Sequence, residues 1–142
     1  MLHRIAIACA TIGDPGPVVA AKRVLSVDDD NQIFSVIRAV AVDLGFSVET
    51  LSESTRFMTT YSRVKPDIIT LDVMMPDMDG LEIIQWLNDI ESTASIIILS
   101  GGARMYMRHG EKLAQARGSL RTAVLAKPFA LDDLRQALLA AC

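Results

Sequence analysis

The chain has 142 residues, enough for one domain with a substantial hydrophobic core and too few for two. Hydrophobic residues make up 51% of the chain and charged residues 22%, which is the composition of a globular protein and not of a disordered one. The formal net charge of −3 gives no basic surface for nucleic acid, so we expect no nucleic-acid partner.

Residues 1–21 form an N-terminal extension that we expect to be flexible, ahead of a single domain over residues 22–142. The apolar stretch that follows Arg4 is about eight residues long, which is short for a signal peptide and far too short to span a bilayer. The two cysteines, Cys9 and Cys142, lie near opposite ends and do not indicate a disulfide framework. We therefore expect a cytoplasmic protein with no membrane partner.

Hydrophobic periodicity divides the first half of the domain into strands and helices. Residues 24–27 form a short apolar strand, after which apolar residues recur at steps of three and four over residues 33–44, the pattern of an amphipathic helix. Gly45 ends that helix. Residues 46–51 alternate like a strand with one solvated face, and Ser52 can cap a helix that continues to about residue 64.

The second half of the domain repeats this alternation. We predict strands at residues 67–71, 96–99 and 122–126, and helices at residues 81–89, 104–117 and 130–140. Leu131, Leu134 and Leu138 recur on one face of the last helix, as in a helix that packs on a sheet. Five strand–helix units in succession predict an α/β fold, in which one five-stranded parallel sheet carries helices on both faces.

Charged side chains follow three of these predicted strands. Asp28 and Asp29 follow the first strand, Asp72 follows the third and Lys127 follows the fifth. The carboxyl ends of parallel strands meet at one edge of a sheet, where open α/β sheets bind their ligands. Clustered carboxylates repel one another unless a cation joins them, and Mg²⁺ prefers oxygen ligands. The sequence therefore predicts a site for a metal ion and a phosphate group.

The same residues lie in motifs that resemble those of the receiver domain of two-component response regulators, and the resemblance covers residues 23–142. The motifs are Val27–Asp28–Asp29, Leu71–Asp72–Val73–Met74–Met75–Pro76 with Asp79–Gly80, Leu99–Ser100–Gly101, and Lys127–Pro128–Phe129. The resemblance implies the flavodoxin-like (βα)5 fold of the stand-alone chemotaxis regulator. It also implies that the chain is a phosphoacceptor signalling protein, which catalyses only its own phosphorylation and dephosphorylation.

The resemblance also assigns a role to each residue of the acidic cluster. Asp72 would accept a phosphoryl group from a phosphohistidine on a histidine kinase or a histidine phosphotransfer protein. Asp29 would bind Mg²⁺ directly, and Asp28 would bind it largely through water. Asp72 and the backbone carbonyl of Met74 would supply further metal ligands.

A second group of residues is expected to bind the transferred phosphoryl group. The resemblance implies that the Ser100 hydroxyl and the Lys127 amine contact its oxygens, and that the Lys127–Pro128 peptide bond is cis. Gly101 has no side chain, so its backbone can approach the phosphoryl group closely. We further expect the Ser100 hydroxyl to move toward the phosphoryl oxygens and to carry the following loop with it.

The chain departs from the receiver pattern in two places. Receivers usually carry an aromatic residue three positions before the lysine, where this chain has Val124, so the aromatic half of the usual switch is missing or has moved. The segment from Ser100 to Lys127 is also longer than in the plainest receivers. Both departures therefore lie in the part of the domain that receivers usually use to switch and to bind a partner.

Three classes of function compete at this stage. The first is a phosphorylation-dependent switch, monomeric or dimerising on phosphorylation, with a phosphate sink or relay intermediate as a related version. The second is an aspartyl phosphohydrolase, but these enzymes carry an acid two residues after the nucleophile, where this chain has Met74. The third is a phosphate-independent interaction module, which the retention of Asp28, Asp29, Asp72 and Lys127 argues against.

Overall fold

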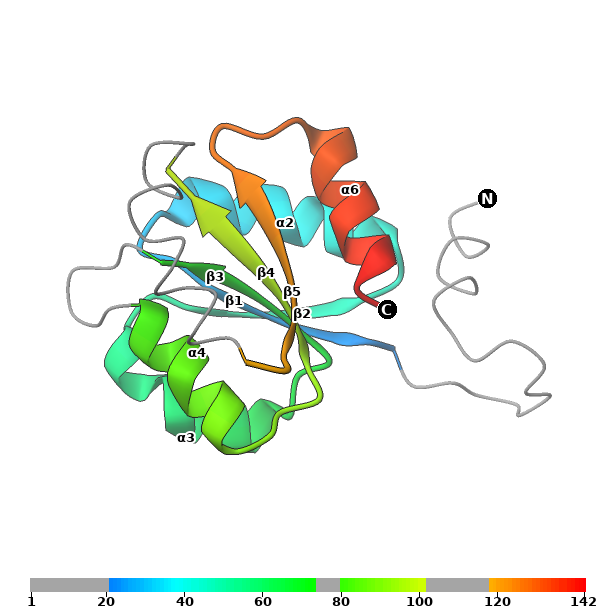
Figure 1. Cartoon of the computed structure of the whole chain (residues 1–142). Coiled ribbons are helices and arrows are strands. Elements are labelled where there is room, and N and C mark those ends of the chain that lie inside the picture. Colours follow the sequence, from blue (N-terminus) through cyan, green and yellow to red (C-terminus); the bar gives the residue numbers. More distant parts are fainter. Residues whose placement is uncertain (1–20, 74–79, 102–117) are drawn as a thin grey trace, which may run out of the picture.

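The computed structural model describes residues 21–73, 80–101 and 118–142, and within them five parallel strands form one sheet. The order across the sheet is β2-β1-β3-β4-β5, so that β1 lies between β2 and β3 (Figure 1). The strands are β1 (Arg23–Val27), β2 (Ser47–Leu51), β3 (Ile68–Asp72), β4 (Ser95–Ser100) and β5 (Arg121–Ala126). The predicted five-stranded parallel sheet is confirmed.

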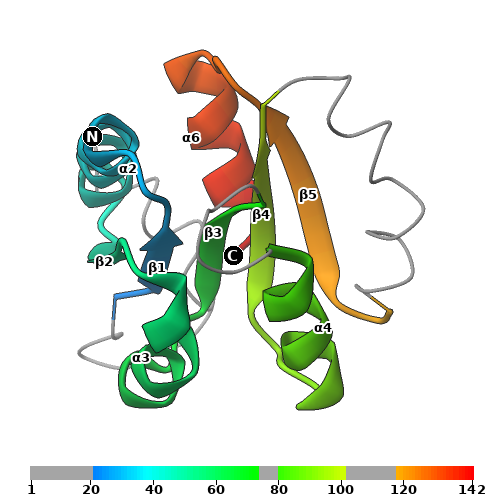
Figure 2. The same cartoon turned by 90° about the vertical axis from the view of Figure 1, so that its left-hand side faces the viewer.

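Helices cover both faces of this sheet. Helices α2 (Asn31–Asp43) and α6 (Leu131–Ala140) pack on one face, and the two helices α3 (Phe57–Val64) and α4 (Gly80–Asp89) pack on the other (Figure 2). Each face therefore has its own hydrophobic core. The predicted α/β layers are confirmed, whereas the predicted helix at 104–117 lies outside the described residues.

The central strands are apolar because they are covered on both sides. Every residue of β3 and β4 is buried, and both strands are rich in isoleucine, whose branched side chain packs well on a pleated surface. The edge strands β2 and β5 are only partly buried. The carboxyl end of β3 is thus fixed in the middle of the sheet, and this strand ends at Asp72.

One local prediction was wrong, and another is confirmed for only part of a helix. Ser52 does not begin a helix. A 3-10 turn at Ser54–Arg56 comes first, and α3 follows it. The Arg56 N–H donates a 3.0 Å hydrogen bond to the Glu53 carbonyl in this turn. Leu131 is 60% exposed, although Leu134 and Leu138 on the same face of α6 are fully buried. Periodicity predicts which face of a helix is apolar, but not whether its first turn meets a neighbour.

The chain termini bear on two further expectations. Cys142 is disulfide-bonded, although the placement of the two cysteines in the sequence did not indicate a disulfide framework. Cys9 lies outside the described residues. No helix in residues 21–73, 80–101 and 118–142 has the length and apolar character needed to cross a membrane.

Candidate functional site

The predicted site residues converge at the carboxyl edge of the sheet. Asp28 follows the last residue of β1, and Asp72 ends the neighbouring strand β3. Ser100 ends β4 and lies opposite Ala126, the last residue of β5, after which comes Lys127. The pairing register alone therefore brings side chains from four strand ends together. This edge is where the order of strands reverses around β1, the usual position of ligand sites in open α/β sheets.

Three carboxylates form the acidic part of the site. Asp28, Asp29 and Asp72 each offer an oxygen that lies within 4.8 Å of the other two. Asp28 and Asp72 are buried, with 0% and 7% exposure, whereas Asp29 is exposed. Three hard oxygen ligands that are open to water on one side fit Mg²⁺, which takes few protein ligands and keeps several waters. The structure thus brings together the three predicted metal-binding aspartates.

Lys127 supplies a positive charge to the cluster. Its Nζ atom donates a 2.9 Å hydrogen bond to Oδ2 of Asp28 and a 3.4 Å hydrogen bond to Oδ2 of Asp72. The ammonium group is thus shared between the two buried carboxylates and neutralises only one of the three acids. The remaining negative charge favours a cation at this site.

The pKa of Asp28 is raised from 3.8 to about 6, chiefly by burial and also by the negative charge of Asp72. The hydrogen bond from Lys127 acts in the opposite direction and is not strong enough to restore the ordinary value. For Lys127, burial favours a lower pKa, but the hydrogen bond and charge of Asp28 outweigh it, so that the pKa is raised overall. Lys127 is therefore protonated at neutral pH.

The turn after β1 positions Asp28. Its backbone N–H donates to the Leu51 carbonyl of β2 at 3.2 Å, and its Oδ1 accepts the N–H of Asp30 at 3.0 Å. The Asp30 side chain in turn accepts the N–H of Gln32 at 2.9 Å and caps α2. Asp30 therefore begins the helix, and its neighbours Asp28 and Asp29 are left to form the site.

The predicted phosphate-binding residues lie at the ends of β4 and β5. The N–H of Lys127 donates a 2.6 Å hydrogen bond to the carbonyl of Ser100, and the Lys127–Pro128 bond is cis, as the resemblance implied. Ser100 is buried and Gly101 is exposed. Met74, the predicted source of a carbonyl ligand, lies outside the described residues. Val124 is 42% exposed in the middle of β5, so a small and accessible side chain occupies the usual aromatic position.

One close contact beside the site did not follow from the sequence. Gly80, the first residue of α4, packs directly on the backbone of Val73, which follows Asp72. The pair Asp79–Gly80 was recognised only as part of a motif. The presence of glycine at a helix start was the signal that could have indicated a close approach of two backbones.

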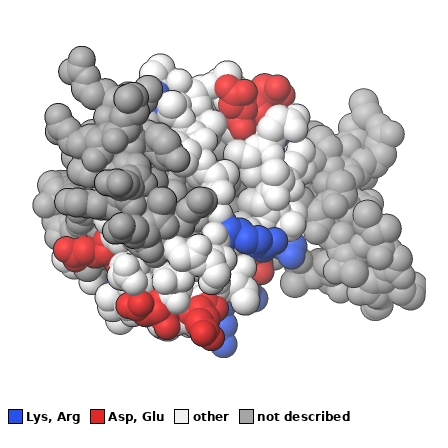
Figure 3. Space-filling view, viewed as in Figure 1, with Lys and Arg blue, Asp and Glu red and all other residues white. Residues whose placement is uncertain are grey.

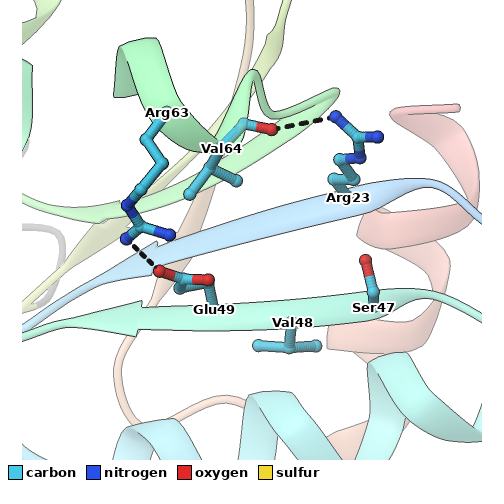
Figure 4. Close-up of a pocket in the computed structure, with 6 residues that line it drawn as sticks. All are labelled: Arg23, Ser47, Val48, Glu49, Arg63 and Val64. Atoms are coloured by element: carbon cyan, nitrogen blue, oxygen red, sulfur yellow. Dashed lines mark hydrogen bonds and ion pairs between the residues drawn. The ribbon is translucent and has the colours of Figure 1, made fainter. Parts of the chain in front are cut away.

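A pocket of about 350 Å³ lies elsewhere, at the amino ends of β1 and β2. Figure 4 shows Arg63 of α3 paired with Glu49 of β2, and the guanidinium of Arg23 donating to the carbonyl of Val64 at 3.1 Å. Arg23 and Asp28 lie at opposite ends of β1, so this pocket is separate from the acidic cluster. Among the described residues visible in Figure 3, acidic side chains form small groups, and basic side chains lie against some of them at the lower edge.

Comparisons with known sequences agree with this geometry. Residues 24–139 match the family described as response regulator receiver domain. The chain is 33% identical over 112 residues to Response regulator MprA of Mycobacterium leprae, a match that covers 79% of this chain and 47% of the relative. It is 28% identical over 116 residues to Transcription factor SKN7 of Candida albicans, covering 78% and 19% of the two chains. The chain thus spans about half the length of the MprA relatives that it matches.

Solved structures show the same fold. The chemotaxis protein CheY4 of Vibrio cholerae matches with a TM-score of 0.75 and 23% identity, covering 87% of this chain and all of that one. A response regulator signal receiver domain from Bermanella marisrubri matches with a TM-score of 0.71 and 30% identity, covering 86% and 98% of the two chains. The flavodoxin-like architecture predicted from the sequence is confirmed.

Proposed function

Because this chain belongs to the response regulator receiver domain family, we propose that it is a phosphorylation-dependent signalling protein whose phosphoacceptor is Asp72. The donor is a phosphohistidine on a histidine kinase or on a histidine phosphotransfer protein. The observation that carries the proposal is the cluster around Asp72, in which oxygens of Asp28, Asp29 and Asp72 lie within 4.8 Å of one another and Lys127 contacts two of the three.

The proposed reaction uses Asp72 as a nucleophile. A carboxylate oxygen of Asp72 forms a bond to phosphorus as the phosphorus–nitrogen bond of phosphohistidine breaks, and the electron pair of that bond stays on the imidazole nitrogen. Transfer of this kind depends mainly on positioning and on neutralising charge. The Lys127 ammonium, which lies 3.4 Å from the Asp72 carboxylate, is placed to neutralise phosphoryl oxygens.

Asp28, Asp29 and Asp72 are the residues that would hold Mg²⁺, with the Met74 carbonyl as a further proposed ligand. When bound, the ion supplies positive charge to the attacking carboxylate and the phosphoryl oxygens. The Ser100 hydroxyl and the Gly101 backbone complete the proposed contacts with the phosphoryl group. Because the resulting acyl phosphate is hydrolysed at the same site, the chain acts on its own modification and not on an external substrate.

We propose that phosphorylation alters binding to a downstream protein target, with the chain monomeric or dimerising when phosphorylated. The receiver domain comprises residues 22–142 in this proposal, residues 1–21 being an extension, and the reaction takes place in the cytoplasm. A phosphate sink or relay intermediate is the second candidate. The exposed Val124 at the usual aromatic position supports it, because a relay does not need the aromatic side chain of the usual output switch.

The test is Mg²⁺-dependent phosphorylation by acetyl phosphate, followed by intact mass. The wild type is expected to gain one phosphoryl group, and Asp72→Asn is expected to gain none. Asp89→Asn is the matched control, because it removes a carboxylate at the end of α4, away from the cluster, and is expected to react like the wild type. Equal labelling of the wild type and Asp72→Asn would refute the assignment of the acceptor.

Labelled wild type then separates the two candidates. A switch is expected to change its affinity for a protein partner on phosphorylation, whereas a relay is expected to pass the group to the histidine of a phosphotransfer protein. If purified wild type takes no phosphoryl group from acetyl phosphate or from a phosphorylated histidine kinase, although it is folded and binds Mg²⁺, the phosphate-independent module replaces both candidates.

A further inference from the structure

The start of α4 rests on the backbone next to the proposed phosphoacceptor. A Cβ atom added at Gly80 would lie 2.5 Å from Cα of Val73 and 3.1 Å from its carbonyl carbon. Both neighbours are backbone atoms, which cannot rotate out of the way as a long side chain can. The Gly80 N–H also donates to the Val73 carbonyl at 3.3 Å, so the two residues are joined as well as packed.

Both sides of this contact are anchored. Val73 is 8% exposed, and its N–H donates a 3.4 Å hydrogen bond to the carbonyl of Leu99 in β4. On the other side, α4 is fixed by the side chains of Ile83 and Ile84, which are 1% and 0% exposed. Neither the strand end nor the helix can move away without breaking core contacts, since protein interiors are close-packed.

We propose that Gly80 is a positioning residue for the acidic site, because its lack of a side chain lets α4 hold the backbone of Val73 and thereby sets the place of the Asp72 carboxylate relative to Asp28 and Asp29. The inference rests on the proposed function. Gly80 contacts neither the metal ion nor the phosphoryl group in this account. It acts through Val73, which is bonded to Asp72.

The expected effect of Gly80→Ala follows from the distances. Carbon atoms in ordinary contact are about 3.5–4.0 Å apart, so the new Cβ must push Val73 and α4 apart by about 1 Å. Sites of this kind tolerate displacements of about 0.5 Å, and a 1 Å misplacement can lower a rate about a hundredfold. We expect the dissociation constant for Mg²⁺ to rise at least about tenfold, with a similar loss in the rate of phosphorylation.

The experiment compares Gly80→Ala with Leu87→Val, which removes a methylene group from a buried residue two turns further along α4. Mg²⁺ affinity is measured by calorimetry, acetyl phosphate incorporation by intact mass and folding by circular dichroism. Gly80→Ala is expected to bind Mg²⁺ weakly, and Leu87→Val is expected to bind it like the wild type. Equal Mg²⁺ affinity for folded Gly80→Ala and wild type would overturn the inference.

A double variant tests which atoms are in contact. The atom nearest to the added Cβ is Cα of Val73, and its side-chain Cβ lies farther away at 3.1 Å. Val73→Gly removes this Cβ but keeps Cα, so adding it to Gly80→Ala is expected not to restore Mg²⁺ affinity. Recovery of wild-type affinity would show that the side chain and not the backbone transmits the effect, which also contradicts the proposal.

The wild type provides a second measurement that does not depend on the variants folding. In a Mg²⁺ titration followed by amide NMR, the chemical shift of the Gly80 amide is expected to change with Mg²⁺ concentration. The dissociation constant from this change is expected to equal the one from the Asp72 amide. The amide of Gly45, which lies between α2 and β2, is the control and is expected to stay unchanged. A Gly80 amide that does not respond while Asp72 does would refute the inference alone. If the wild type neither binds Mg²⁺ nor accepts phosphate, the proposed function fails first.

Discussion

Replacing Asp28 by asparagine is expected to stabilise the fold in the absence of divalent metal. Asp28 is fully buried, and its pKa is raised to about 6 chiefly by burial. A carboxyl group with a higher pKa in the folded state than in the unfolded state binds its proton more tightly when folded. Its contribution therefore favours folding at low pH and is lost as the pH rises from about 4 to about 6. At pH 7 the ionised carboxylate opposes folding.

The magnitude follows from the size of the shift. A rise from 3.8 to about 6 corresponds to up to about 3 kcal/mol at pH 7. The asparagine amide has the same shape as the neutral acid, and its oxygen can still accept the N–H of Asp30. Asp28→Asn is therefore expected to raise the free energy of unfolding by up to about 3 kcal/mol at pH 7, and by roughly half as much at pH 5.

The assay is urea unfolding in EDTA at pH 7 and pH 5, repeated with Mg²⁺ at pH 7. Asp29→Asn is the control, because Asp29 is exposed and its removal in EDTA is expected to change stability by no more than about 0.5 kcal/mol. Mg²⁺ is expected to stabilise the wild type more than either variant, since a ligand stabilises the state that binds it. Lower stability of Asp28→Asn than of the wild type at pH 7 in EDTA would refute the reasoning, because the ion pair with Lys127 would then outweigh the cost of burial.

Three further predictions concern the fold. Gly118→Ala is expected to lower the melting temperature, because Gly118 has a φ of +50° and an added Cβ would lie 2.4 Å from Oδ1 of Asn88; an unchanged melting temperature would contradict this. Leu134→Ala is expected to cost about 2–5 kcal/mol in urea unfolding, and Leu131→Ala about 0.5 kcal/mol or less, and equal losses would mean that Leu131 is packed. Tyr61→Phe is expected to cost about 1 kcal/mol in urea unfolding by removing the 2.6 Å hydrogen bond to its serine partner, and a stabilised variant would refute this.

The placement of the acidic cluster could be predicted because it depends only on strand order. Asp28, Asp72 and Lys127 each follow an apolar run, and once those runs are assigned to parallel strands their carboxyl ends must meet. The N-cap of α2 has a local signal as well, since an aspartate that precedes an amphipathic pattern is a common N-cap and Asp30 occupies that position. These predictions use information that lies within a few residues of each side chain.

Other features depend on distances between elements, which the pattern does not contain. The contact of Gly80 with Val73 follows from how deeply α4 packs, and the exposure of Leu131 follows from where α6 begins relative to its neighbours. The difference between Asp28 and Asp29 is of the same kind. Two adjacent aspartates look alike in the sequence, but Asp28 is enclosed by the sheet and Asp29 faces solvent. Burial is the main cause that raises the pKa of Asp28 to about 6.

The acidic site therefore lowers the stability of the fold. A buried carboxylate beside a second one opposes folding, and a single lysine shared between them compensates only in part. The fully buried strands β3 and β4 supply the hydrophobic stabilisation that allows such a cluster to persist at their ends. Under the proposed function this arrangement has a physical consequence. A cation that relieves the repulsion at Asp72 also stabilises the fold, because a ligand stabilises the state that binds it.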